Sequence, residues 1–288
     1  MTIKLWAGSE ESLKSMADID ARIELKMSSG ATLPESSPLL QITDNGVGII
    51  SVSGPISTNH SPWHAFFGGT SYEAISGALV DAAMNPDVKQ VILDINSGGG
   101  AVNGVADASS LIQKIDTQVK PVVSYSGSNA LSAAYWLASS ARKVYASKIA
   151  TIGSIGVITT HMEDSKAMIE AGITATVIRA GKYKALASPH EPLTAEARAQ
   201  IQDTLDAAYT VFAEHVSTAR GMTYAAFDKK AGQGRTFFGV QAVDAGLADE
   251  ITAFDGALSK VSKINIDKTK LRAENPLQIE GVEPMTVA

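Results

Sequence analysis

Short apolar runs of strand length alternate with helix-like segments through most of this 288-residue chain. The predicted strands cover residues 46–56, 88–96, 121–125 and 143–146, and the predicted helices between them cover 72–84, 104–115 and 128–139. Strands joined by helices form βαβ units, and such units build a mostly parallel sheet with helices on its faces. The alternation therefore predicts an α/β fold.

The pattern continues beyond residue 146 with weaker strand signals and one strong helix. Residues 153–159 are typical of a strand or a turn, 165–171 of a short helix, and 174–180 ("TATVIRA") of a strand. Residues 195–219 give the clearest helix prediction, because Thr194 can cap the segment and apolar residues recur on one face. That face carries Ile201, Leu205, Ala208, Phe212 and Val216.

Changes in composition divide the chain into three parts. Residues 28–38 ("SSGATLPESSP") are rich in turn formers, so residues 1–45 are interpreted as an N-terminal arm and linker. Residues 46–258 hold the alternating strands and helices and are predicted to form one domain. Residues 259–288 are polar and predict a tail.

Charge and composition exclude several classes of function. The formal net charge is −6 and no long run of Lys and Arg occurs, so nucleic acid is not an expected partner. The absence of cysteine excludes disulfides, thiolate catalysis and cysteine metal sites. Residues 1–7 lack the apolar core of a standard secretion signal, and no stretch approaches the roughly 18 apolar residues of a membrane span. A cytoplasmic protein is expected.

Four familiar motifs fail on inspection. After Gly98 and Gly100, a dinucleotide-binding loop needs a third glycine where Asn103 stands, and the segment before Lys182 lacks the first glycine of a phosphate-binding loop. His60 and His64 are four residues apart, but Pro62 and nearby glycines predict a loop, which disfavours a metal site. No G-x-S-x-G elbow occurs, so an ordinary Ser-His-Asp hydrolase lacks local support.

The stretch "SNALSAAYWLAS" (128–139) sets a serine among small residues with no ionisable side chain nearby. A catalytic serine needs a base, donors for an oxyanion and room for a substrate. Ser132 at a helix start and the glycines 98–100 after a strand offer the donors and the room. A buried lysine can act as the base, and Lys182 and Lys184 are the local candidates, although both also fit as surface lysines.

Five segments in order resemble the signal-peptide-peptidase (protease IV) family of serine peptidases, which share the Clp-protease/crotonase fold. The segments are "VILDINSGGGAVNG", "SNALSAAYWLAS", "IGSIGV", "GKYKALASP" and "GRTFFGVQAVDAGLADEI". The similarity runs from about residue 46 to 258. It implies repeated ββα units and a mostly parallel sheet covered by helices.

The resemblance also implies a Ser-Lys dyad. Carried over by position, the nucleophile falls on Ser132, the base on Lys184, and the serine that orients the lysine amine on Ser154. The oxyanion donors fall on the N–H groups of Gly99 and Ala133. The flanking glycines, Gly98 and Gly100, would bind the substrate backbone. The family usually has proline at the position of Gly98 and glycines at positions 133 and 134, so the loop here is looser and the cleft tighter.

The length and the N-terminal arm are most similar to the branch of the family that works in phage and prophage head assembly. That branch implies a polypeptide substrate such as a scaffold, portal or capsid protein, a homo-oligomer that hides the active site, and no metal or organic cofactor. Two alternatives stay open: a soluble bacterial peptidase that degrades signal peptides or other peptides, and a structural head protein without turnover. A crotonase-type hydratase is disfavoured, because it would use acidic residues and have no need of a Ser-Lys pair.

Overall fold

The computed structural model describes residues 5–30, 32 and 38–264, and the predicted tail beyond residue 264 lies outside them. A six-stranded sheet forms the centre, in the order β13-β10-β8-β6-β3-β2. Its strands are β2 (Leu40–Ile42), β3 (Val47–Ser53), β6 (Gln90–Asn96), β8 (Val122–Ser126), β10 (Val144–Ala146) and β13 (Glu250–Ile251). Only the β2–β3 pair is antiparallel, so the mostly parallel sheet expected from the alternation is confirmed.

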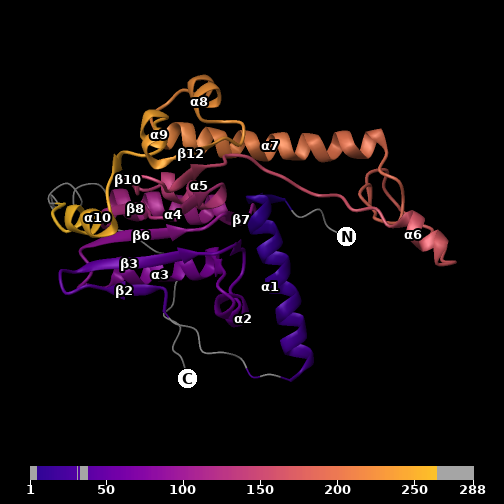
Figure 1. Ribbon diagram of the computed structural model, residues 1–288, viewed down its shortest axis with the longest axis horizontal. Helices are drawn as coiled ribbons and strands as arrows, with labels where there is room; N and C mark the ends of the chain where they lie inside the picture. Colours follow the sequence, from indigo (N-terminus) through magenta and orange to yellow (C-terminus); the bar gives the residue numbers. More distant parts are fainter. Residues whose placement is uncertain (1–4, 31, 33–37, 265–288) are drawn as a thin grey trace.

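Both faces of the central sheet are covered, which explains the continuous apolar runs of its strands. Side chains alternate between the faces: Leu93 and Ile95 belong to the main core, whereas Ile92 belongs to a smaller cluster on the other side. Helices α3 (Tyr72–Met84), α4 (Val105–Gln118) and α5 (Ala133–Ser139) pack on the main core, and α10 (Phe254–Val261) packs on the smaller cluster. Figure 1 shows these layers.

A short strand follows each of the central strands β3, β6, β8 and β10, and a helix follows the pair in most units. The short strands are β4 (Ile56–Ser57), β7 (Gly99–Ala101), β9 (Asn129–Leu131) and β11 (Thr151–Gly153). They belong to two small sheets, which also contain β1 (Trp6–Gly8), β5 (Thr70–Ser71) and β12 (Thr236–Phe238). The units β6-β7-α4 and β8-β9-α5 are the repeated ββα units that the fold prediction requires. The predicted fold class is therefore confirmed.

The N-terminal residues are tied to the core by a strand and a helix. Strand β1 pairs with β7, and Ser9 caps the following helix α1 (Glu10–Ser28). The α1 helix packs against α2 (Pro62–Phe66). His64 in α2 lies 3.1 Å from the sulfur of Met16, so the prediction that this histidine sits in a loop is wrong. Pro62 occupies the first turn of α2, where proline fits a helix.

The C-terminal half adds one long helix that extends beyond the core. Helix α7 (Ala195–Ala219) has the predicted bounds and the predicted cap at Thr194. Of its predicted apolar face, only Phe212 and Val216 are buried, because the first half of α7 runs past the sheet. Figure 1 shows α8 (Tyr224–Lys230) and α9 (Gly239–Asp244) near one end of α7 and α6 (Ser165–Glu170) beyond the other.

Two element predictions fail for identifiable reasons. Residues 129–131 form strand β9 rather than the first turn of a helix, because they pair with β11 in parallel register. Residues 174–180 form no strand, although their β-branched residues favour one. Ile178 in this segment is 92% exposed, and within the described residues the segment pairs with no strand. Strand propensity without a partner edge does not produce a sheet.

In the part of the chain that the structure describes, no helix combines the length and the apolar character that crossing a bilayer requires.

Candidate active site

Ser132 lies on a sharp turn between strand β9 and helix α5. Its backbone has φ 54° and ψ −123°, a conformation that costs free energy for any residue with a Cβ. The turn is fixed by a hydrogen bond from its N–H to the carbonyl of Gly153, at 2.7 Å. Its hydroxyl donates to the carbonyl of Gly156 at 3.2 Å, and the residue is 1% exposed. A serine on a strained strand-to-helix turn is the arrangement of a nucleophile elbow.

Small buried residues allow this elbow to form. Ala130 and Ala134 stand two residues on either side of Ser132, and both are fully buried. They occupy the places that glycine holds in a G-x-S-x-G elbow. The sequence signal was therefore present as A-x-S-x-A, but a search for the glycine form misses it.

The strand register brings Ser154 next to Ser132. Leu131 at the end of β9 pairs with Gly153 at the end of the parallel strand β11, so the next residue on each strand leaves the sheet at the same edge. Ser154 also has a positive φ, 55°, and its N–H donates to the carbonyl of Arg235 at 2.7 Å. The predicted nucleophile and the predicted orienting serine are thus neighbours in space.

The glycines that follow β6 lie on the other side of the elbow. The N–H of Leu131 donates to the carbonyl of Ser97 at 3.1 Å, which joins the two chain segments. The N–H of Gly99 donates to the Ser97 hydroxyl at 3.1 Å, so this predicted oxyanion donor is engaged within the loop. A Cβ on Gly99 would lie 2.9 Å from the carbonyl oxygen of Leu131, and a Cβ on Gly100 would lie 2.0 Å from the carbonyl oxygen of Ile56. Glycine is required at both positions because a Cβ would collide with neighbouring backbone atoms, and at Gly99 the positive φ also favours glycine.

Ala133 is the first residue of α5 and lies directly beside Ser132. The first N–H groups of an α-helix have no acceptor within the helix, which is why the resemblance makes this one an oxyanion donor. Ala133 is fully buried, so a donor at this position acts in a water-poor environment. Gly98, in contrast, packs against the first turn of α1, since a Cβ there would meet Ser9 and Ser12 at 2.8 Å.

The fold of the chain does not bring Lys184 to Ser132. It is exposed and lies in a turn closed by a hydrogen bond from its N–H to the carbonyl of Gly181, at 3.1 Å. Figure 1 shows that the segment between α6 and α7, which contains this turn, lies at the far end of α7 from α5. The other candidate, Lys182, forms an ion pair with Glu196 at 2.7 Å. The hydrogen bond to that carboxylate raises the pKa of the Lys182 amine, which disfavours Lys182 as a base.

Two of the three predicted catalytic residues have a positive φ. Among the described residues other than glycine, positive φ values occur at Ser132, Ser154, Ala185 and Gln233. Ala185 directly follows Lys184, and Gln233 is two residues from Arg235, whose carbonyl binds the N–H of Ser154. Such conformations persist where the surrounding structure holds them, and they gather at functional sites. This observation is independent of the sequence motifs.

A buried polar cluster supports the helix that follows the nucleophile. His215 on α7 lies with its Nε2 at 3.0 Å from the Ser109 hydroxyl on α4 and 2.9 Å from the Ser140 hydroxyl at the end of α5. Its ring also lies 5.5 Å from that of Trp136, which stacks on Phe212 at 4.4 Å. The cluster ties α4, α5 and α7 together beneath the elbow. Sequence inspection missed it, because no motif links these residues.

We expect His215 to make stability fall at mildly acidic pH. Burial lowers its pKa to about 4, whereas an unfolded chain holds histidine near 6.5. The unfolded state therefore binds more protons between these values, and stability present above pH 6.5 is lost as pH falls toward 4. Because the ring is partly exposed, we expect a loss of about 1–2 kcal/mol in the free energy of unfolding between pH 7.5 and 5.

Urea unfolding of wild type and His215→Gln at the two pH values measures this loss. The glutamine amide can hydrogen-bond the two serines but does not titrate, so the difference in pH dependence between the two proteins isolates the imidazole. His190→Gln is the matched control, since His190 is exposed. An equal pH dependence in wild type and His215→Gln would contradict the assignment.

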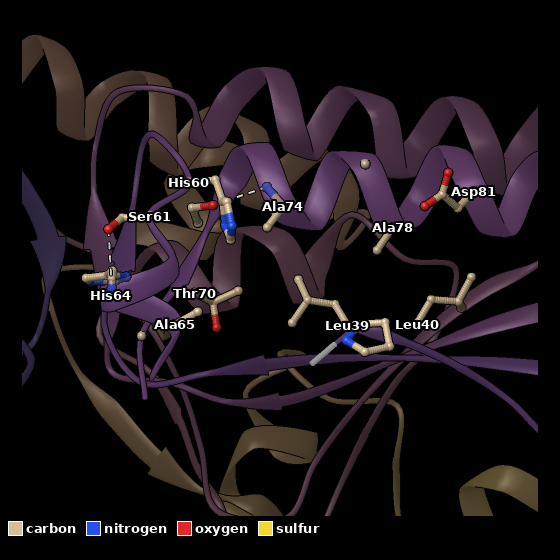
Figure 2. Close-up of a pocket in the computed structure, with 14 residues that line it drawn as sticks. Leu39, Leu40, His60, Ser61, His64, Ala65, Thr70, Ala74, Ala78 and Asp81 are labelled. Carbon is tan, nitrogen blue, oxygen red and sulfur yellow. Dashed lines mark hydrogen bonds between the residues drawn. The ribbon is translucent and has the colours of Figure 1, made fainter. Parts of the chain in front are cut away.

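A separate cavity of about 260 Å³ lies between α2, α3 and the segment before β3. Figure 2 shows Ser61 and His64 at one end and Asp81 toward the other, with Leu39 and Leu40 along the side. No cluster of three or more His, Cys, Asp or Glu residues suited to a metal ion occurs within the described residues. None of the predicted catalytic residues lines this cavity.

The fold and the elbow define a class: an α/β protein of the Clp-protease/crotonase type, with a strained serine where the parallel strands β9 and β11 end. The sequence profile of peptidase family S49 matches residues 114–266. The chain belongs to this family, as the resemblance predicted.

Three relatives show the range of similarity. The chain is 33% identical over 215 residues to the head-tail preconnector protein GP5 of Enterobacteria phage P21, covering 75% of this chain and 42% of that protein. It is 30% identical over 245 residues to the capsid assembly protease C of Escherichia phage lambda, covering 85% and 55%. It is also 30% identical over 223 residues to protease 4 of Haemophilus influenzae, covering 76% and 35%. The chain thus spans about half the length of the phage relatives.

Proposed function

We propose that this chain is a serine peptidase that uses Ser132 as nucleophile and Lys184 as general base. The observation that carries the proposal is the strained elbow at Ser132, with Ser154 and the glycine strand β7 beside it, in a member of family S49. Backbone strain of this kind gathers at functional sites, which supports a catalytic role for the serine.

In the proposed reaction the neutral amine of Lys184 takes the proton of the Ser132 hydroxyl as its oxygen attacks the scissile carbonyl. The N–H groups of Ala133 and Gly99 bind the oxyanion. For Gly99 this exchanges the hydrogen bond to Ser97 for one to the substrate, a replacement that costs little net free energy. The ammonium group of Lys184 then returns that proton to the leaving nitrogen as the C–N bond breaks, which leaves an acyl-enzyme and the neutral amine. The same amine then takes a proton from the water that hydrolyses the acyl-enzyme. Ser154 orients the amine. No metal or organic cofactor is needed.

We infer that Lys184 reaches Ser132 from a neighbouring copy of the chain. The two residues are separated within a protomer, and the segment around the lysine carries large apolar side chains that face solvent. These are Met162, Ile169, Ile173, Ile178 and Tyr183, all more than half exposed. Exposed apolar surface of this extent marks an interface. Burial between two copies would remove water from the ammonium group and favour the neutral amine.

The proposed substrates are polypeptides of a phage or prophage head. The support is the similarity to a capsid assembly protease and a head-tail preconnector protein, together with the strained elbow at Ser132. Scaffold, portal and capsid proteins are the first candidates.

The test uses the full chain, which is co-expressed with phage head proteins and then separated by size-exclusion chromatography. Each fraction is assayed for cleavage of casein and examined for fragments of the head proteins. Fragments should appear with the oligomeric fractions and be absent from fractions of protomer size, because only an oligomer contains complete sites. Binding of head proteins without any cleavage, in every fraction, would favour a structural head protein and contradict the proposal.

A further inference from the structure

The first described residues of the chain lie in the strand position beside the active site. Trp6, Ala7 and Gly8 form β1, which pairs antiparallel with β7 in the register Trp6↔Ala101, Ala7↔Gly100 and Gly8↔Gly99. On its other edge, Trp6 exchanges two hydrogen bonds with Ile158, at 3.0 and 2.9 Å. The segment is thus an extended peptide held between two chain segments, both of which adjoin the elbow.

The residues just after β1 occupy carbonyl groups of the glycine loop that an extended substrate would use. The N–H of Ser9 donates to the carbonyl of Gly98 at 2.8 Å, and the hydroxyl of Ser12 donates to that of Gly99 at 3.0 Å. A Cβ on Gly99 would lie 2.3 Å from the carbonyl oxygen of Ala7, so β1 presses directly on the loop of the proposed oxyanion hole. A second peptide cannot pair with β7 on this edge while β1 is there.

Contacts at Gly99 show that β1 lies close to the nucleophile. A Cβ on Gly99 would meet both the carbonyl oxygen of Ala7 in β1 and that of Leu131, the residue before Ser132. A hollow of about 700 Å³ continues from Gly8 and Ser9 along Ser154 and Gly156, and the Ser132 hydroxyl donates to the carbonyl of Gly156. The path from β1 therefore leads along the residues that surround the proposed nucleophile.

We propose that β1 occupies the peptide-binding groove of the enzyme and inhibits it, so that a substrate must displace residues 5–9 to bind. This inference rests on the proposed function, because a groove beside the elbow binds a substrate only if the chain is a peptidase. Binding by an added strand uses main-chain hydrogen bonds for affinity and side-chain pockets for selectivity. Ala7 is fully buried in the main core, so the vacated pocket accepts a small apolar side chain of an extended polypeptide.

Several features make β1 displaceable. The strand is three residues long, and its buried Trp6 indole N–H has no hydrogen-bond partner within the described residues, which costs free energy. Of the helix that follows, only Ser12 and Ile19 are buried. Two further contacts stabilise the position of this helix modestly. Met16 contacts His64, and Arg22 lies 4.3 Å from the centre of the Phe67 ring. The residues of β1 are themselves buried, so its release depends on the short length of the strand and on α1, which buries few of its residues and can open locally.

The test is the Ala7→Glu variant of the full chain. A carboxylate cannot be buried at this position without a partner, so β1 should leave the groove. We expect KM for casein to fall at least about tenfold with kcat little changed, because the fraction of open grooves limits apparent affinity. Ala21→Glu is the matched control, since Ala21 is exposed on α1 and should leave KM unchanged. If Ala7→Glu does not fold, Trp6→Ala weakens the same strand and should shift KM in the same direction.

A binding measurement separates this inference from the proposed function. A fluorescent peptide of residues 5–10, "LWAGSE", is titrated into the Ser132→Ala chain with and without Ala7→Glu, and anisotropy is recorded. The peptide should bind at least about tenfold more tightly when β1 is displaced, and the peptide "LWEGSE" should bind poorly. Tighter binding without cleavage by any variant would sustain the groove and reject the peptidase. Equal peptide binding and unchanged KM, or loss of both, would overturn the inhibitory role of β1.

Discussion

Ser132→Ala should lower kcat for casein by at least about a thousandfold, because it removes the atom that forms the acyl-enzyme. The hydroxyl makes one hydrogen bond, to the carbonyl of Gly156 at 3.2 Å, and the side chain is buried in a small space. Alanine fits that space and keeps the Cβ that the turn already holds. The fold should therefore persist, and circular dichroism and size-exclusion chromatography should match those of wild type.

Ser128→Ala is the matched control for this substitution. Ser128 lies four residues before the elbow, and it is exposed, so its loss should change kcat by less than about twofold. A folded Ser132→Ala protein that cleaves casein at the wild-type rate would remove the nucleophile assignment. Cleavage would then have to come from another residue, and the strained turn would need a structural explanation.

Lys184→Met should lower kcat by about 10²- to 10⁴-fold, the usual contribution of a general base. Methionine retains an unbranched apolar side chain but has no amine. Lys184 is exposed within the protomer, so the substitution should not change the stability of the isolated fold. The measurement is the initial rate of casein cleavage at equal concentrations of chain and with matching size-exclusion profiles.

Lys182→Met tests whether activity is lost because the Lys184 amine is removed or because any lysine of this exposed segment is replaced. Lys182 lies two residues away on the same exposed turn, and its ion pair with Glu196 is solvent-exposed and contributes little stability. We expect its kcat to stay within about twofold of wild type. If Lys182→Met loses activity and Lys184→Met keeps it, the positional transfer from the family is wrong by two residues.

The central sheet was predictable because its signal is local. Runs such as residues 90–96 are apolar on both faces, and α3 begins at a recognisable cap, Ser71. Helix α3 therefore has the predicted bounds, Tyr72–Met84. Residues 174–180 show the opposite case, since a strand needs a partner edge and the sequence does not say whether one is within reach.

The residues of the candidate site could be predicted from the sequence, but the way the fold arranges them could not. Parallel register places Ser132 and Ser154 side by side, a consequence of strand pairing that the motifs imply. The distance of Lys184 from them depends on the course of the segment between α6 and α7, which no local pattern sets. The pairing of β1 with β7 joins residues more than 90 positions apart and was also beyond sequence inspection.

The most direct test of the account mixes two inactive proteins. Ser132→Ala and Lys184→Met are combined in equal amounts, allowed to exchange subunits, and assayed on casein, with differently tagged chains co-purified to prove that mixed oligomers formed. If each site takes its serine from one copy and its lysine from the next, random assembly completes about one quarter of the sites and restores about that share of the wild-type rate. Mixed oligomers as inactive as either parent would contradict a dyad built between copies.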